Sequence, residues 1–327
     1  MRLLVIGGTQ FVGRHIVEAA LARGHDVTLF HRGATNPGLF PSAEEIHGDR
    51  DGDLENLGDG PWDAAIDSCG YVPRIVSASA AYLKDKVDRY AFISSISVFA
   101  DLSQPGLDED SPVGTIDDPT GEEVDENNYG PLKALCEDAV RKAFPDAHTI
   151  VRPGLVTGPH DHTDRFTYWP HRIARGGDVL APSLDRGVQY IDARDLGDFV
   201  VTAIESDRGG TFNAVTEPGT ITMGDLLQTC RDVAHSNANF IVADDAVLLE
   251  AGVEPWMGLP LWVPPDDEEF GSLMTVRSDR AIAAGLNFRS LAETVRDTLE
   301  WDRGRGETEF KAGLSAEKEA EVLASLR

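Results

Sequence analysis

Short apolar runs alternate with helix-periodic segments through the first half of the chain. Runs rich in β-forming residues predict strands at Leu3–Ile6, Asp26–His31, Glu45–His47, Asp63–Ser68, Arg89–Ser94 and Ala147–Arg152. Apolar residues recur at helical spacing from Phe11 onward, from Pro73 to about Lys84 and from Tyr129 to Phe144. Strands that alternate with helices form βαβ units, so the pattern predicts an α/β fold with a doubly wound parallel sheet.

The pattern changes after Pro153. Further elements are expected at Gln189–Asp192 (strand), Arg194–Glu205 (a helix that returns to the sheet), Thr211–Val215 (strand), Met223–His235 (helix) and Ser315–Leu326 (charged helix). We predict a first domain at 1–158, with 188–207 returning to it. A smaller mixed α/β substrate lobe would comprise 159–187 and 208–327. A ligand is expected in the cleft between them, at the strand ends.

The opening sequence MRLLVIGGTQFVGRHI joins a buried strand to a helix through Gly7 and Gly8. Glycines let the backbone approach a pyrophosphate, and the free N–H groups of a helix start face its negative charge. Together with Gly13, the pattern predicts a Rossmann-type domain that binds a dinucleotide. Gln10 stands where the usual fingerprint has another glycine, so a slightly different approach is expected. A purely structural turn is the alternative.

The end of the second strand, Phe30-His31-Arg32-Gly33, lacks the acidic residue that holds a ribose 2′-hydroxyl in NAD-binding proteins. Arg32 can instead pair with a 2′-phosphate, which favours NADP over NAD. The alternative is an arginine that stacks on adenine in either cofactor. Asp49 is placed to accept a hydrogen bond from the adenine amino group, or it is a turn residue.

Tyr129 and Lys133 lie four residues apart and therefore share one helix face. A phenol has a pKa of about 10, and a nearby ammonium lowers it toward the range of a general base. Lys133 could also bond a cofactor ribose. Ser95, at the end of the fifth strand, is the preferred hydroxyl for holding a substrate oxygen, with Ser94 and Ser97 as alternatives. Such serines are also frequent as turn residues.

These motifs occur in a familiar order. GGTQFVG, SSISVF, YGPLK and RPGLVTGP resemble the short-chain dehydrogenase/reductase superfamily, in its extended epimerase/dehydratase branch. The side chain at the middle glycine resembles an atypical subgroup, which includes epimerases, reductases and chloroplast stem-loop RNA-binding proteins. The resemblance covers nearly the whole chain, including GVQYIDARDLGDFV and GLNFRSLAETVRDTLEWDR.

The resemblance implies roles for residues that match the family motifs. Ser95, Tyr129 and Lys133 match its catalytic triad. The residues matching its cofactor-binding segments are Gly7, Gly8, Gln10, Phe11, Gly13, His31, Arg32, Asp49, Arg50, Ser68, Cys69, Gly70, Lys133, Pro153 and Gly154.

Two positions depart from the family pattern. Ile96 and Ser97 stand where dehydratases carry an acidic pair, so that elimination chemistry lacks its acid and base. Leu155 stands where many epimerases have asparagine, which argues against ordinary nucleotide-sugar contacts.

Composition limits the partners. The chain has 56 acidic and 29 basic residues, a formal charge of −27, so we expect no nucleic-acid and no membrane partner. The three cysteines match no disulfide framework, and neither a signal peptide nor a membrane span is seen, which favours a cytoplasmic protein. His160 and His162 are spaced like metal ligands, but no second cluster of ligand residues accompanies them, so no metal is expected. Five arginines could bind an anionic group of the substrate or balance nearby acids: Arg165, Arg172, Arg175, Arg186 and Arg194.

The sequence therefore predicts an NAD(P)-dependent oxidoreductase or epimerase that acts on a hydroxyl or keto carbon of a small, sugar-like or anionic substrate. A catalytically silent nucleotide-binding regulator, or an RNA-binding relative of the same fold, is the alternative. The helices that begin at Pro73 and Tyr129 could form a homodimer contact, as in relatives, or could be solvated.

Overall fold

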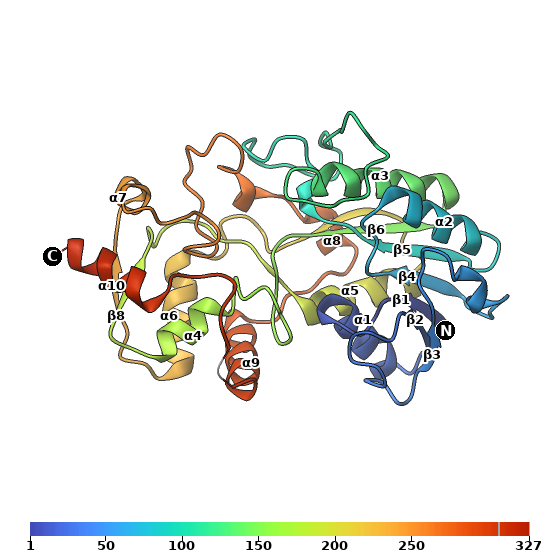
Figure 1. Ribbon diagram of the computed structural model, residues 1–327, viewed down its shortest axis with the longest axis horizontal. Coiled ribbons are helices and arrows are strands. Elements are labelled where there is room, and N and C mark those ends of the chain that lie inside the picture. The colour runs from blue at the N-terminus through green and yellow to red at the C-terminus, as the bar shows by residue number, and fades with distance from the viewer. Residues whose placement is uncertain (307, 327) are drawn as a thin grey trace.

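Seven parallel strands form the main sheet of the computed structural model, which describes residues 1–306 and 308–326 (Figure 1). The strand order is β10-β6-β5-β4-β1-β2-β3. The strands are β1 (Arg2–Ile6), β2 (Asp26–His31), β3 (Glu44–His47), β4 (Ala64–Asp67), β5 (Arg89–Ile93), β6 (His148–Pro153) and β10 (Gly210–Ala214). Since β1 pairs with both β2 and β4, the chain order reverses at β1, and the carboxyl ends of these strands form the crevice where such sheets bind ligands.

Helices cover both faces of this sheet. Helices α1 (Phe11–Ala22) and α5 (Ala193–Glu205) pack on one face, and α2 (Pro73–Leu83) and α3 (Tyr129–Ala143) pack on the other (Figure 1). Side chains of β1 alternate between the two layers. Leu3 and Val5 join the core under α1 and α5, whereas Leu4 and Ile6 join the core under α2 and α3. Burial on both faces explains why the central strands are continuous apolar runs.

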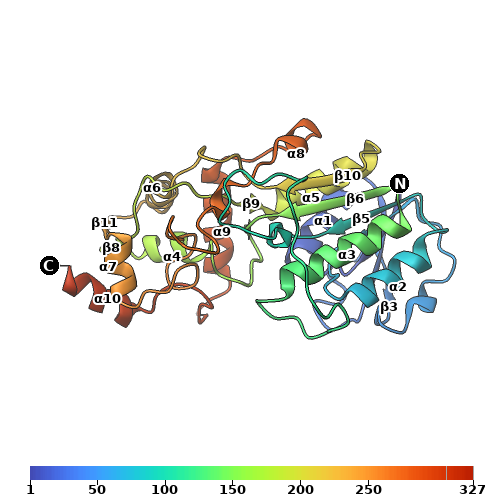
Figure 2. The same ribbon diagram turned by 90° about the horizontal axis from the view of Figure 1, so that it is seen from above.

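The second lobe lies beside the sheet and has its own core (Figure 2). It contains α4 (Tyr168–Ala174), β8 (Asp178–Ala181), α6 (Met223–Ala234), β11 (Asn239–Val242), α7 (Asp245–Glu250), α9 (Leu291–Gly304) and α10 (Ala316–Ser325). The fully buried rings of Trp169 and Trp262 are the largest members of this core. Strands β8 and β11 pair in parallel, as do β7 (Val156–Thr157) and β9 (Ile191–Asp192) at the junction with the sheet.

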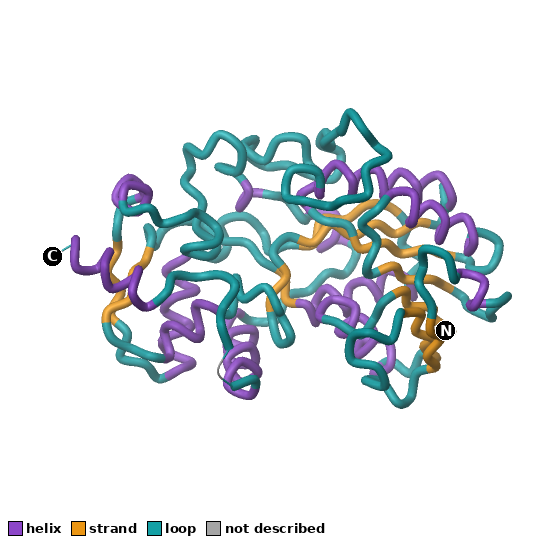
Figure 3. The backbone as a smooth tube through the Cα atoms, in the orientation of Figure 1, coloured by secondary structure: helices purple, strands orange, loops and turns teal. Residues whose placement is uncertain are grey.

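Two long irregular segments, 101–128 and 251–278, run side by side along one edge of the molecule (Figure 3). Backbone hydrogen bonds join Ser272 to Leu102 and Arg277 to Leu107. The acidic segment 101–128 is therefore anchored, because Leu102 and Leu107 are buried although most of its acids face solvent. The short helices η2 (Ile96–Val98) and α8 (Asp279–Ala283) flank these segments, η3 (Leu273–Thr275) lies within the second one, and η1 (Leu54–Leu57) follows β3.

The predicted strands and helices of the first domain are confirmed to within about one residue at each end. One assignment is wrong: the strand at Thr211–Val215, placed in the substrate lobe, is β10 of the main sheet and pairs with β6. Its Phe212 and Ala214 pack into the core beside α5. The predicted strand Gln189–Asp192 is shorter than expected, as β9, and pairs with β7. A strand's partner is a non-local choice that its own residues do not reveal.

No helix among the described residues is both long and apolar enough to cross a lipid bilayer. Cys69, Cys136 and Cys230 are free thiols.

A buried ion pair ties α3 to the sheet. Arg152 of β6 donates two hydrogen bonds, of 2.8 and 2.7 Å, to Glu137 of α3, and both side chains are almost fully buried. Because removal of one partner leaves a buried charge uncompensated, Glu137→Gln should lower the free energy of unfolding by about 3–5 kcal/mol in urea titrations. The matched change Asp279→Asn, in an exposed pair with Arg277, should cost less than about 1 kcal/mol. Equal effects would contradict this role.

Candidate active site

A single continuous cavity of about 1040 Å³ opens at the carboxyl ends of the sheet strands. Its floor comes from the β1–α1 turn and the ends of β2, β5 and β6. Its opposite wall comes from the second lobe and the segment 251–278. The volume lies at the upper end of the usual range for ligand pockets, which suits a ligand as long as a dinucleotide with a small substrate beside it.

The glycine turn has the geometry that a phosphate-binding loop needs. Gly7 and Gly8 have φ values of +94° and +96°, which side chains rarely adopt. A Cβ at Gly13 would lie 2.9 Å from the backbone nitrogen of Gly8, so glycine lets α1 pack closely on the turn. Gln10 has extended backbone (φ −136°, ψ 138°) that any residue adopts, which explains why glycine is dispensable there. Phe11 begins α1 at a strained φ of +34°.

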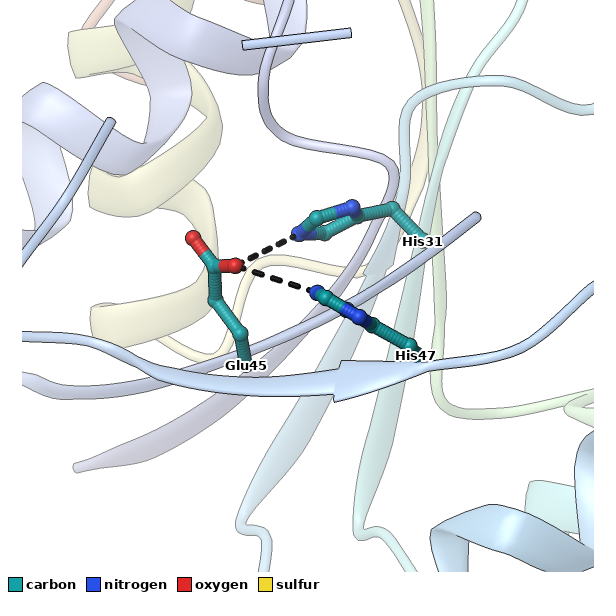
Figure 4. A group of neighbouring side chains, drawn as sticks. All are labelled: His31, Glu45 and His47. Atoms are coloured by element: carbon teal, nitrogen blue, oxygen red, sulfur yellow. Dashed lines mark hydrogen bonds and ion pairs between the residues drawn. The ribbon is translucent and has the colours of Figure 1, made fainter. Parts of the chain in front are cut away.

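The residue at the end of β2 is His31, and it lies in a cluster with two residues of β3. His31 and His47 both face Glu45, with Nε2 atoms 3.6 and 3.2 Å from one carboxylate oxygen (Figure 4). Their spacing resembles a metal-ligand set. However, the Gly33 N–H donates to Nδ1 of His31, and burial lowers the pKa of His31. The neutral ring then holds its proton on Nε2, the atom that a metal would need. We therefore assign no metal here.

Arg32 extends from the same strand end to the cavity wall, is exposed, and forms no ion pair within the described part of the chain. It is therefore available to a ligand at this end of the cavity.

The next two predicted residues have different surroundings. Arg50 lines the cavity, but its guanidinium donates hydrogen bonds of 2.7 and 2.6 Å to the fully buried Asp67, and it also bonds Ser79. Its contact with a cofactor is limited accordingly. Asp49 also lines the cavity, and its carboxylate accepts a hydrogen bond from the Asp51 backbone, as in a turn.

Tyr129 is the first residue of α3, and Ser95 precedes η2 as its N-cap. The two elements touch at Gly130, where an added Cβ would lie 2.0 Å from the Ser97 carbonyl oxygen. Ser95 Oγ accepts a hydrogen bond from the Ser97 backbone and donates one to Ser97 Oγ. Ser95 can therefore serve as a turn residue and still lie close to Tyr129. Gly130 is a residue whose importance the motif alone did not reveal.

The electrostatics of Tyr129 combine opposing effects. Burial raises the pKa of the phenol, while a hydrogen bond with Ser95 and the positive charge of Arg165 lower it. The tyrosine therefore rests as a protonated phenol whose anion has two stabilising neighbours. Arg165 is a cation whose charge acts on the phenol, while the ammonium of Lys133 is bonded to backbone carbonyls.

Lys133 is buried beneath the site. Its ammonium donates hydrogen bonds of 2.8 Å to the Gly70 carbonyl and 2.6 Å to the Ile93 carbonyl. Burial lowers the pKa of Lys133 to about 8, so the group is mostly charged at neutral pH. An ammonium has three donors, so one proton remains for a cofactor hydroxyl.

The other predicted residues lie around the same space. Ser94, Ser97, Ser68, Cys69, Pro153 and Gly154 line the cavity. Ser68 and Cys69 both bond the Ile6 carbonyl, which fixes the end of β4 beside the glycine turn. Gly70 lies outside the lining, and its carbonyl holds Lys133.

Of the five arginines singled out in the sequence, Arg165 is the one that lines the cavity. Arg172, Arg186 and Arg194 pair with Glu319, Asp245 and Asp192, and Arg175 is exposed. The histidines and acids around His160 are not among the candidate metal-ligand groups of the described residues. His160 faces Arg14, and Asp161 accepts hydrogen bonds from Thr163. Trp256, which stacks on Arg165, was not separable from core tryptophans by sequence.

The comparisons with known proteins agree with this geometry. Residues 59–215 match the model of the NAD dependent epimerase/dehydratase family. The bovine (Bos taurus) epimerase family protein SDR39U1 is 25% identical over 255 residues, covering 70% of this chain and 79% of that protein. Just under half of the chain is therefore similar to this family, and the similarity to the bovine protein extends over a larger part of it.

Solved structures share the fold at low sequence identity. The NAD⁺ complex of WbmH from Bordetella bronchiseptica has a TM-score of 0.68 at 16% identity, covering 94% of this chain and 99% of that one. The NAD complex of UDP-glucuronic acid 4-epimerase from Bacillus cereus has a TM-score of 0.65 at 16% identity, covering 94% and 100%.

The contact at Gly130 should be essential for placing Tyr129. In Gly130→Ala, the new methyl group would displace α3 from Ser97, and we expect a loss of about 1–3 kcal/mol in unfolding free energy together with impaired activity. Gly304→Ala, in a helix with nothing near the added Cβ, should be neutral or stabilising by up to about 1 kcal/mol. Thermal and urea unfolding measure both. A neutral Gly130→Ala would disprove the tight contact.

Proposed function

We propose that the protein is a nicotinamide-dependent epimerase or oxidoreductase that acts on a hydroxyl or keto carbon of a small substrate. The observation that carries this proposal is the meeting of Tyr129 and Ser95 at the wall of a cavity whose other end is a glycine turn. The match of residues 59–215 to the epimerase/dehydratase family model and the NAD-bound structural neighbours support the same cofactor class.

The residues present fit a dinucleotide. The turn at Gly7 and Gly8 and the start of α1 form a cradle for a pyrophosphate. Arg32 lies free at the end expected to hold the adenosine ribose, so we propose that it favours a 2′-phosphate and hence NADP. Lys133 has one donor left for a ribose hydroxyl nearer Tyr129. When bound, the nicotinamide ring would supply the hydride acceptor and donor.

Side chains of the protein itself would carry out the proton transfer. Tyr129 Oη would take the proton of the substrate hydroxyl, or return it to a carbonyl oxygen, as general base and acid. Ser95 would hold the same oxygen and, with Arg165, would stabilise the phenolate. Because burial raises the pKa of Tyr129, oxidation of an alcohol should become faster as pH rises and the phenol ionises. In an epimerase the proton would return to the same oxygen after the carbon is inverted.

Tyr129→Phe should reduce turnover by about 10²–10⁴-fold, because it removes the proton carrier and leaves the ring in place. Turnover is followed by the near-ultraviolet absorbance of reduced nicotinamide with a panel of secondary alcohols and hydroxy acids. Affinity for NAD⁺ and NADP⁺, measured by calorimetry, should be unchanged. Firm cofactor binding with no turnover in either protein would favour the catalytically silent regulator.

Arg32→Ala should weaken NADP⁺ binding by about 10- to 100-fold, because a charge-assisted hydrogen bond to the 2′-phosphate is lost. Binding of NAD⁺ should change less than about threefold, since no phosphate is present there. Calorimetric titration with each nucleotide measures the ratio. An unchanged ratio would contradict the proposed contact between Arg32 and the 2′-phosphate.

A further inference from the structure

Four arginine or lysine side chains line the described cavity. The groups to which each is bonded show which of them is available to a substrate. Arg50 is bonded to Asp67, and Lys133 is bonded to two backbone carbonyls. Arg32 follows β2, which lies on the opposite side of β1 from β5, the strand that precedes Ser95. Arg165 is therefore the cation available to a substrate beside Tyr129 within the described part of the cavity.

Arg165 is held in place but is not neutralised. Its Nε donates a weak hydrogen bond of 3.3 Å to Thr163, and its guanidinium stacks 5.5 Å from the Trp256 ring centre. No carboxylate of the described residues lies within ion-pair distance. The acid that acts on it electrostatically is Asp161, whose Oδ1 accepts two hydrogen bonds from Thr163. A part-buried guanidinium with free terminal N–H groups facing a cavity favours an anionic ligand.

The cavity lining also includes apolar side chains, among them Leu102, Val215, Trp256, Met257, Phe270 and Met274, together with the polar side chains of His162, Thr163 and Gln189. Apart from Asp49, which follows β3, the acidic residues of the lining are Glu126, Glu254 and Asp267. A diphosphate would meet one cation and three acids, so this end does not match a nucleoside diphosphate sugar. A single anionic group on an apolar body matches it better.

We propose that Arg165 binds the single carboxylate of a small, otherwise apolar substrate and thereby places the reacting carbon beside Tyr129 and Ser95. A planar guanidinium fits a carboxylate through two parallel hydrogen bonds, and the stacking on Trp256 orients that plane. The reaction at that carbon rests on the proposed function, whereas the binding of the carboxylate does not.

Calorimetry on the full chain saturated with NAD⁺ or NADP⁺ tests this subsite with benzoate as the probe and with benzamide as its uncharged counterpart. Benzoate should bind the wild-type protein, and benzamide should bind about 10- to 100-fold more weakly. Arg165→Gln should weaken benzoate by the same factor. Arg165→Lys, which keeps the charge without the planar fork, should fall between. Arg175→Gln, the exposed matched control at the end of α4, should bind benzoate as the wild type does.

Several outcomes would overturn the proposal. These are no saturable benzoate binding, equal binding of benzoate by Arg165→Gln, tighter binding of phenyl phosphate than of benzoate, and tighter binding of UDP-glucose than of benzoate. Unchanged cofactor affinity and melting temperature in Arg165→Gln exclude a folding defect. Failure of the proposed function would appear separately, as absent cofactor binding or as turnover that Tyr129→Phe leaves unchanged.

Discussion

The close contact between the start of α3 and the end of β5 is the constraint on which the site depends. Gly130 lets the helix touch the Ser97 carbonyl, and Lys133, one turn further on, is bonded to the carbonyls of Ile93 and Gly70. These contacts join the helix to two neighbouring strand ends. Tyr129 is held at the cavity wall as a consequence, beside Ser95, and its position is not left to a flexible loop.

Charge is distributed unequally between the surface and the interior. The surface carries the acidic excess, while buried carboxylates such as Asp67 and Glu137 are paired with arginines. Such pairs contribute little net stability but are costly to break, so they fix the geometry of neighbouring strands and helices. Most arginines that are buried or part-buried are likewise paired with carboxylates. Arg32 and Arg165 line the cavity without such a partner in the described part of the chain, which leaves both available to an anionic ligand.

The cavity wall opposite the glycine turn comes in large part from the segment 251–278, which supplies aromatic and thioether side chains. Leu155 and Ile96 also line the cavity. A fold that hosts many functions is expected to differ between its members at such a wall. The likeness to solved epimerase structures therefore shows the fold and does not determine the substrate.

The sequence by itself determined most strands and helices of the main sheet and the glycine turn that follows β1. Strand runs, helical spacing and the turn at Gly7 are local signals, so the elements and the glycine cradle were predictable to within about one residue. Tertiary structure decided what depends on distant neighbours. It placed β10 at the sheet edge beside β6, committed Arg50 to Asp67, and bonded the ammonium of Lys133 to the carbonyls of Gly70 and Ile93. A residue's type sets what it can bond, but only the packing of remote segments decides which partner it meets and which charge is left for a ligand.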